Sequence, residues 1–189
     1  GEERTTTTSS TVAIGWAETD ITPNRPVSLA GQHHVRIASH VKDPLTATVL
    51  FLGSGDDPAS ACTVLVSCDL LAIDDGLRDG VRKRIRTLIP EMDPLSIILN
   101  ATHTHTAPNT LGTIAPQDGQ DVMQPTEYVA FATERIAEAI RTAWTRRAPG
   151  GVAFGLGQAV VGHNRAASYV GGKSRMYGRL NDPAFRHME

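Results

Sequence analysis

The sequence predicts an α/β protein in which helices pack on a mixed β-sheet. Runs of strand-forming residues alternate along the chain with two longer segments whose apolar residues recur every three or four positions. Strands and helices that alternate in this way are typical of a sheet with helices on at least one face. With 189 residues, of which 40% are hydrophobic and 20% charged, the chain suits one globular domain with a hydrophobic core.

The two ends of the chain differ from the rest. Residues 1–11 are polar, rich in threonine and without apolar periodicity, so we expect a flexible leader there and a domain over 12–189. Residues 162–189 contain two adjacent glycines and several arginines, but little apolar sequence that could form a closing strand or helix. We therefore expect this tail to continue into further structure or to pack on a partner, and the domain to be incomplete.

Short apolar or β-branched runs predict the strands. A strand over 12–17 is ended by prolines, and a loop follows over 23–42. The runs 45–52 and 62–69 flank a polar turn, which predicts two paired strands joined as a hairpin. Residues 95–99 are almost wholly apolar, as in a strand that is covered on both faces, and are the best candidate for a central strand.

Two amphipathic helices are predicted. The first begins at Asp74 and is ended by Pro90. Its apolar residues are Ile73, Leu77, Val81, Ile85 and Leu88. The second runs over 126–146 and is closed by the Pro-Gly pair that follows it. A last strand is expected over 152–161.

Composition excludes several kinds of partner. The formal net charge is −2 and no basic stripe is present, so a nucleic-acid partner is not expected. No apolar stretch approaches the roughly 20 residues that span a bilayer, and the first ten residues are polar where a signal peptide would be apolar. The compartment is left open between secreted and cytoplasmic. Cys62 and Cys68 lie in one predicted strand, roughly 20 Å apart, so we expect no disulfide between them.

A His-Thr-His segment is the strongest chemical signal. It follows the predicted strand 95–99, and a period of two would place His103 and His105 on one face. Open α/β sheets tend to build their sites outside the carboxyl ends of strands. Neutral imidazole is a favoured zinc ligand, so the pair predicts a zinc site. The alternative is that two polar histidines simply leave a strand and enter solvent.

His-X-His also occurs in other metal families, and two of them fit poorly. A metallo-β-lactamase-type site would continue with an aspartate and another histidine, where this chain has Thr106 and Ala107. An amidohydrolase barrel would place the pair on its first strand, whereas several strands precede His103 here.

Three segments, 15–23, 66–70 and 101–108, resemble the neutral (alkaline) ceramidases and their shorter bacterial relatives in order and spacing. The Ala-Thr-His-Thr-His sequence, followed by Pro108, is the specific part. This resemblance implies that the chain is the N-terminal portion of a larger ceramidase-like α/β catalytic domain. It further implies a zinc-dependent hydrolase of an N-acyl (amide) bond, with a lipid amide as substrate.

The resemblance also assigns roles to individual residues. His103 matches a zinc ligand, and His105 matches a catalytic residue that contacts the substrate amide or its oxyanion. Arg165 looks like the family's catalytic arginine near the substrate, although on its own it reads as a solvated arginine. His40 is similar in position to a histidine that lines the substrate site, and a surface histidine is the alternative.

Two carboxylates and several missing residues complete the comparison. Asp20 and Asp69 are expected to be structural, one capping a turn and one ending a strand. The family's second zinc histidine, its zinc glutamate and tyrosine, and its proposed serine nucleophile would follow Glu189. A catalytic zinc normally keeps three protein ligands, so the isolated chain is expected to be inactive or very weak.

The expected partners are therefore a small-molecule or lipid amide, the C-terminal part of the same domain and, at its periphery, a membrane surface. Two other functions stay open. The chain could be a truncated paralogue that acts as a non-catalytic binding module. It could also belong to a different metal hydrolase that is assembled from two chains, with His33, His34 or His40 completing the zinc sphere.

Overall fold

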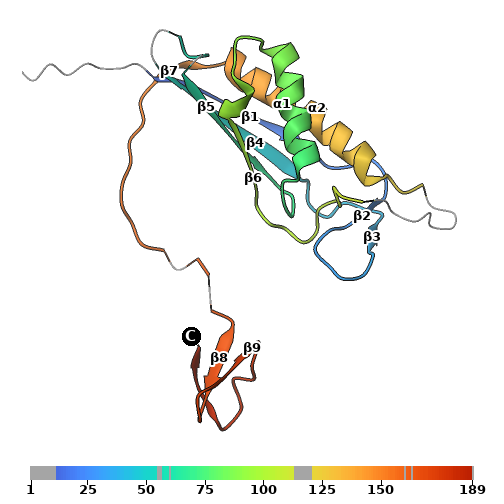
Figure 1. Ribbon diagram of the computed structural model, residues 1–189, viewed down its shortest axis with the longest axis vertical. Helices are drawn as coiled ribbons and strands as arrows, with labels where there is room; N and C mark the ends of the chain where they lie inside the picture. The colour runs from blue at the N-terminus through green and yellow to red at the C-terminus, as the bar shows by residue number, and fades with distance from the viewer. Residues whose placement is uncertain are drawn as a thin grey trace, which may run out of the picture. The chain divides into compact units, whose positions relative to one another are not determined.

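The structure is a computed structural model, shown in Figure 1. It describes residues 12–54, 57–59, 61–112, 121–159, 161–162 and 164–188. The chain groups into two compact units, Gly1–Val152 and Ala153–Glu189, and each is described by itself. The expected flexible leader, residues 1–11, lies outside the described residues. The expectation of a single domain over 12–189 stays a prediction.

A mixed sheet of five strands forms the body of the first unit, in the order β6-β5-β4-β1-β7. The strands are β1 Val12–Asp20, β4 Thr46–Ser54, β5 Cys62–Cys68, β6 Ile97–Ala101 and β7 Ala148–Gly150. All neighbours pair antiparallel except β5 and β6, which are parallel. The predicted α/β class with a mixed sheet is confirmed, as is the hairpin of the second and third long strands.

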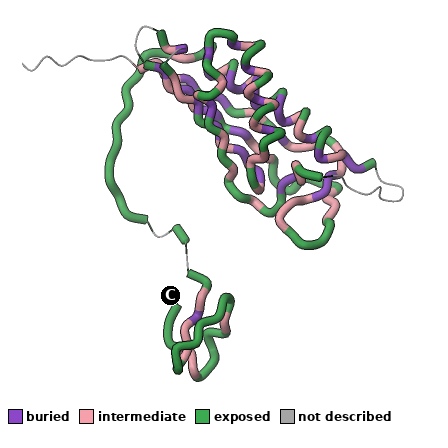
Figure 2. The backbone as a smooth tube through the Cα atoms, viewed as in Figure 1, coloured by how far each residue is buried: buried purple, intermediate pink, exposed green. Residues whose placement is uncertain are grey.

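Helices α1 (Asp75–Leu88) and α2 (Pro125–Thr145) lie side by side over one face of this sheet (Figure 1). Both were predicted from their periodicity. In α1 the buried residues are Leu77, Val81 and Ile85, which share one face of the helix. Figure 2 shows buried residues gathered between the helices and the sheet. None of the helices in the described part of the chain is long and apolar enough to cross a membrane. Peripheral contact with a membrane stays a prediction.

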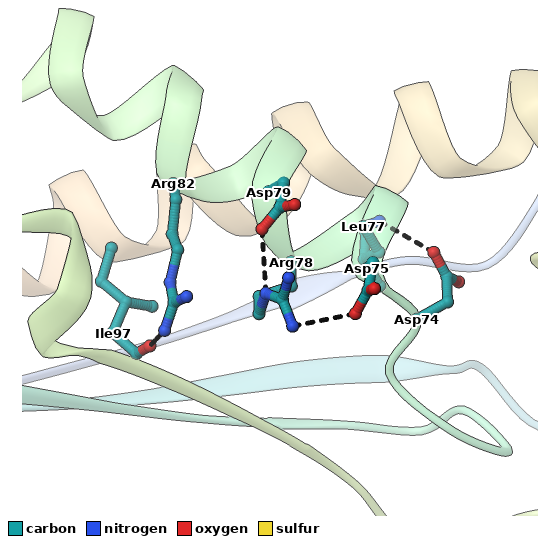
Figure 3. A network of polar contacts seen from close by, with 7 residues as sticks. All are labelled: Asp74, Asp75, Leu77, Arg78, Asp79, Arg82 and Ile97. Atoms are coloured by element: carbon teal, nitrogen blue, oxygen red, sulfur yellow. Dashed lines mark hydrogen bonds and ion pairs between the residues drawn. The ribbon is translucent and has the colours of Figure 1, made fainter.

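Polar contacts fix the start of α1 and join the helix to the edge of the sheet (Figure 3). The Asp74 side chain accepts a hydrogen bond from the Leu77 N–H at 3.0 Å and caps the helix. Further along, Arg82 donates to the Ile97 carbonyl at 2.9 Å, which attaches α1 to β6. This contact thereby anchors the strand that leads into the His-Thr-His segment.

The position of β6 corrects one prediction. Residues 95–99 were expected to form a central strand, yet in the described part of the chain β6 is an edge strand that pairs with β5 alone. Its first residue, Ile97, is fully buried under the helices, whereas Ile98 is 51% exposed on the opposite face. A short apolar run does not by itself distinguish a strand covered on two faces from one covered on a single face.

The sheet face away from the helices accounts for that apolar run. The pairing aligns Trp16, Leu50, Leu65 and Ile98 in one row across four strands. Three of these side chains, those of Trp16, Leu65 and Ile98, are exposed. Apolar residues on this face therefore contribute to the strand signal without being part of the core.

The end of the chain differs from its prediction. Residues 152–161 were expected to form a strand, but those of them that the structure describes are exposed and belong to no strand or helix, and the strand nearest to this segment is β7. The tail was expected to contain no strand, yet it forms a three-stranded antiparallel sheet in the order β10-β8-β9. Its strands are β8 Ala166–Tyr169, β9 Lys173–Met176 and β10 Phe185–Met188.

A glycine turn explains the hairpin in this second unit. Gly171 and Gly172 connect β8 to β9 with φ angles of +86° and +71°, which glycine adopts without strain. Adjacent glycines between two short runs are a hairpin signal, and it was present in the sequence. Of the described residues in this unit only Ala167 is buried, which is why apolar content did not reveal the strands.

Candidate functional site

The two histidines of the His-Thr-His segment lie against each other. Their ring centroids are 5.1 Å apart and the ring planes are nearly perpendicular, at 88°. The expected proximity of the pair is present, but its cause is not the strand period. Strand β6 ends at Ala101, and His103 has a φ angle of +65°, outside the range of a strand. The segment instead lies beside the end of β5 and the residues that follow it. The Thr102 N–H donates to the Cys68 carbonyl, and the Thr104 N–H donates to the Leu70 carbonyl.

Each ring is held by a backbone carbonyl. His103 Nδ1 lies 2.8 Å from the Leu71 carbonyl, and His105 Nδ1 lies 2.8 Å from the Gly31 carbonyl. A carbonyl only accepts, so Nδ1 carries the proton in both rings, and in the neutral form Nε2 keeps its lone pair. A histidine whose Nδ1–H is bound to a carbonyl is the usual arrangement of a metal ligand that coordinates through Nε2.

A second segment of the chain is folded along the His-Thr-His segment. The predicted loop 23–42 contains two short antiparallel strands, β2 Val27–Ser28 and β3 Ile37–Ala38. The Ala30 N–H donates to the Ala107 carbonyl at 2.9 Å, and the Asn109 N–H donates to the Ser28 carbonyl at 2.7 Å. The turn between β2 and β3 therefore lies beside the histidine pair and supplies Gly31.

Asp20 and Asp69 are structural, as expected. Asp20 accepts hydrogen bonds from the hydroxyl and the N–H of Thr22, which lower the pKa of Asp20 below its ordinary value. Asp69 accepts from the N–H and the hydroxyl of Thr46 at 2.9 and 3.0 Å, and from the Thr102 hydroxyl at 3.2 Å. The carboxylate thereby joins the start of β4 to the segment that leads into the histidines.

The neighbouring Cys68 is a poor candidate nucleophile. Burial, with a further contribution from the charge of Asp69, raises the pKa of the Cys68 thiol to about 12. The thiol is therefore protonated in neutral water, whereas nucleophilic attack needs the thiolate. As predicted, Cys68 and Cys62 are not bonded to each other.

A cavity of about 800 Å³ lies on one side of the histidine segment. His40 lines it, together with Thr104 and Thr106, whose hydroxyls are 3.0 Å apart and which flank His105 in the chain. Most of the remaining wall is apolar and comes from the segments 22–29 and 38–45. His40 is thus placed in a cavity that borders the His-Thr-His segment, and it does not join the two stacked rings.

A smaller hollow of about 240 Å³ is lined by residues that include His33 and His34. Gly31 and Leu71, whose carbonyls hold the rings of His105 and His103, line it as well. His33 and His34 therefore share a hollow with the two carbonyls that hold the histidine pair, and both of their side chains are exposed.

Arg165 belongs to the second unit. Its guanidinium donates to the Tyr177 hydroxyl at 2.7 Å, and its carbonyl accepts from the Tyr177 N–H at 2.8 Å. Its expected place beside the substrate stays a prediction.

The described residues fit only part of a zinc centre. Nowhere among them do three or more His, Cys, Asp or Glu side chains lie close enough to hold a metal ion. The donors available at the pair are the Nε2 atoms of His103 and His105, and a catalytic zinc normally keeps three protein ligands. Gly31 and Arg36, which contact His105, were not recognised as site residues. The single glycine amid the loop histidines was the one available signal for Gly31.

No protein-family model and no curated protein sequence matches the chain. Solved structures do. The neutral ceramidase from Pseudomonas aeruginosa matches with a TM-score of 0.58 at 18% identity, over 75% of this chain and 22% of the ceramidase chain. A ceramidase complexed with C2 matches with a TM-score of 0.55, the same identity and the same coverage. The chain therefore has the fold of part of a neutral ceramidase and spans less than a quarter of that enzyme's length.

Proposed function

We propose that this chain supplies part of a zinc-dependent hydrolase centre that cleaves an N-acyl (amide) bond, as in a ceramidase. The observation that carries the proposal is the histidine pair. Both rings are fixed through Nδ1, and the Nε2 lone pair of each ring is left to bind a metal ion or to accept a hydrogen bond. The ceramidase fold of the chain supports this choice over other reactions that use His-X-His sites.

In this proposal His103 is the zinc ligand. A bound zinc ion would polarise the amide carbonyl and make a water or hydroxyl nucleophile more acidic. Leu71 fixes the His103 ring through its carbonyl, so that the ring has one orientation before metal arrives. Such an arrangement reduces the ordering that binding would otherwise require.

His105 is assigned to the substrate. Its Nδ1–H is bound to the Gly31 carbonyl, so the neutral ring offers the Nε2 lone pair and accepts a hydrogen bond from the substrate amide N–H. Donation to the oxyanion would require the imidazolium form, which carries a proton on both nitrogens. Arg165, which is always charged, is the better candidate for the oxyanion, and it is proposed for that role from the resemblance alone.

A lipid amide is the proposed substrate class. The cavity lined by His40 has a volume of about 800 Å³ and a mainly apolar wall, which suits an acyl chain, while His40 is a polar contact for the head of the molecule. One of the matching ceramidases is complexed with C2, so a ligand binds that relative. The chain covers 22% of the ceramidase, and the remaining zinc ligands are proposed to come from the rest of such a domain.

Two alternatives rest on specific observations. Because no three metal-binding side chains meet among the described residues, the chain could bind a ligand without turnover. Because His33 and His34 line the hollow next to the carbonyls that hold the pair, they could instead complete a metal site shared between two chains.

Zinc binding, measured by titration of the chain with zinc, tests the proposal. Because the chain holds only part of the centre, we expect weak binding by the wild-type chain and none by His103→Ala, with His33→Ala as the matched control that binds as the wild type does. Loss of binding in His33→Ala as well would favour the two-chain site. Equal binding by the wild type and His103→Ala would contradict the role of His103, and no binding by any of the three proteins would favour the binding module.

A further inference from the structure

Arg36 connects the turn between β2 and β3 to the backbone of the histidine pair. One terminal nitrogen of its guanidinium donates to the His105 carbonyl at 2.6 Å and to the Ala30 carbonyl at 3.0 Å. These carbonyls belong to segments 75 residues apart in the chain. The Arg36 guanidinium thus holds His105 and also Ala30. Ala30 precedes Gly31, whose carbonyl accepts the hydrogen bond from the His105 ring.

The contact restrains the ring through two peptide groups. His105 Nδ1 donates to the Gly31 carbonyl, so the ring orientation depends on how the turn and the His-Thr-His segment face each other. Arg36 holds the turn and the segment together through the carbonyls of Ala30 and His105. The hydrogen bond from the Ala30 N–H to the Ala107 carbonyl joins the same two stretches of backbone two residues after His105. Arg36 thus adds a restraint at the carbonyl of His105 itself, between the backbone bonds made by Thr104 and Ala107.

The position of Arg36 is itself well defined. Its carbonyl accepts from the Leu29 N–H at 2.8 Å, and the next residue, Ile37, pairs with Ser28 in the short sheet. Its Nε atom is buried and has no hydrogen-bond partner among the described residues. Burial of a cationic donor without a partner is costly, so the contacts of the terminal nitrogen have to offset that cost.

We propose that Arg36 is a positioning residue that sets the His105 ring, with its Nδ1–H on the Gly31 carbonyl and its Nε2 toward substrate. The functional meaning of this inference rests on the proposed role of His105, but the geometry does not. The guanidinium is suited to the task, because the two N–H bonds of its terminal nitrogen are fixed in one plane and point at the two carbonyls, whereas the N–H bonds of an ammonium rotate.

The test is the tautomer of each histidine, read from two-bond ¹H–¹⁵N correlations of the ¹⁵N-histidine-labelled full chain without metal. In the wild type we expect His103 and His105 both to be Nδ1-protonated. In Arg36→Met the His105 signals should move toward a mixture of tautomers, while those of His103 stay unchanged, because Leu71 holds that ring separately. The control is Arg84→Met, which removes another half-buried arginine, paired with Glu134, and should leave both rings unchanged.

The outcomes separate this proposal from the proposed function. Wild-type His105 signals in Arg36→Met, or an equal change in Arg84→Met, would overturn the positioning role whatever the zinc measurement gives. If Arg36→Met does not fold, Arg36→Lys decides. The lysine side chain is shorter and its ammonium is not held in a plane, so we expect partial averaging confined to His105, and unchanged His105 signals would again overturn the proposal. Absence of zinc binding would leave this result intact.

Discussion

The α-carbon of Gly31 faces the imidazole of His105 so closely that a side chain there would collide with the ring. A methyl group added to Gly31 would lie 2.5 Å from His105 Nδ1, and Gly31 has a φ angle of +87°. Glycine is therefore required twice at this position, once for the backbone conformation and once for the approach of the ring. The carbonyl of the same residue accepts the ring's Nδ1–H, so the position and the tautomer of His105 have a common origin.

Gly31→Ala should displace the His105 ring and destabilise the fold. The positive φ alone lowers the free energy of unfolding by about 1 kcal/mol. The collision lowers it by roughly a further 1–3 kcal/mol. Gly112→Ala is the matched control, because Gly112 has a φ of +77° and no atom of the described residues lies within 4 Å of the added methyl group. In Gly31→Ala both the free energy of urea unfolding and the His105 tautomer should change. In the control only the free energy of unfolding should change, by about 1 kcal/mol. Equal effects in the two variants would contradict the close contact.

Asp69→Asn should reduce stability without reducing zinc binding. The carboxylate accepts hydrogen bonds from Thr46 and Thr102, and an amide leaves part of this network unsatisfied at a cost of about 1–3 kcal/mol. Because Asp69 makes structural contacts, zinc titration of the folded variant should match the wild type, in contrast to His103→Ala. A folded Asp69→Asn that no longer binds zinc would show that the carboxylate is a ligand after all.

Periodic apolar patterns predicted those elements whose pattern depends only on the face that the element buries. The helix α1 was predicted almost to the residue, because Leu77, Val81 and Ile85 must share the face that packs on the sheet. The place of β6 in the sheet could not be predicted in the same way. Its position at the edge depends on its pairing with β5 and on the contact from Arg82, and neither is encoded in the residues of β6.

The candidate site shows the same division. The residue types at 103 and 105 predicted that two imidazoles would meet, and they do. The means by which they meet could not be predicted, since His103 adopts a positive φ and the acceptor of His105 lies 74 residues away at Gly31. Arg36 was missed for the same reason, because its two carbonyl partners are recognisable only once the turn is folded against the segment.

Glu127 should make the stability of the first unit depend on pH in the acid range. The N–H of Gln124 and then the guanidinium of Arg25 lower the pKa of Glu127 below its ordinary value of 4.5. Because the folded-state pKa is depressed, the carboxylate contributes stability that is fully present above about pH 4.5 and is lost as the pH falls through the folded-state pKa. Arg25 lines the large cavity, so this acid also supports the cavity wall.

Glu127→Gln should therefore weaken the decrease in the urea midpoint between pH 5 and pH 3, measured by circular dichroism in steps of about half a pH unit. Arg25→Met should weaken it less, because the Gln124 N–H, which has the larger effect on the pKa of Glu127, remains in place. Equal pH dependence in the wild type and in Glu127→Gln would mean that the carboxylate has the same pKa in the folded and unfolded chain. In that case Glu127 would not link the start of α2 to the wall of the cavity through its charge.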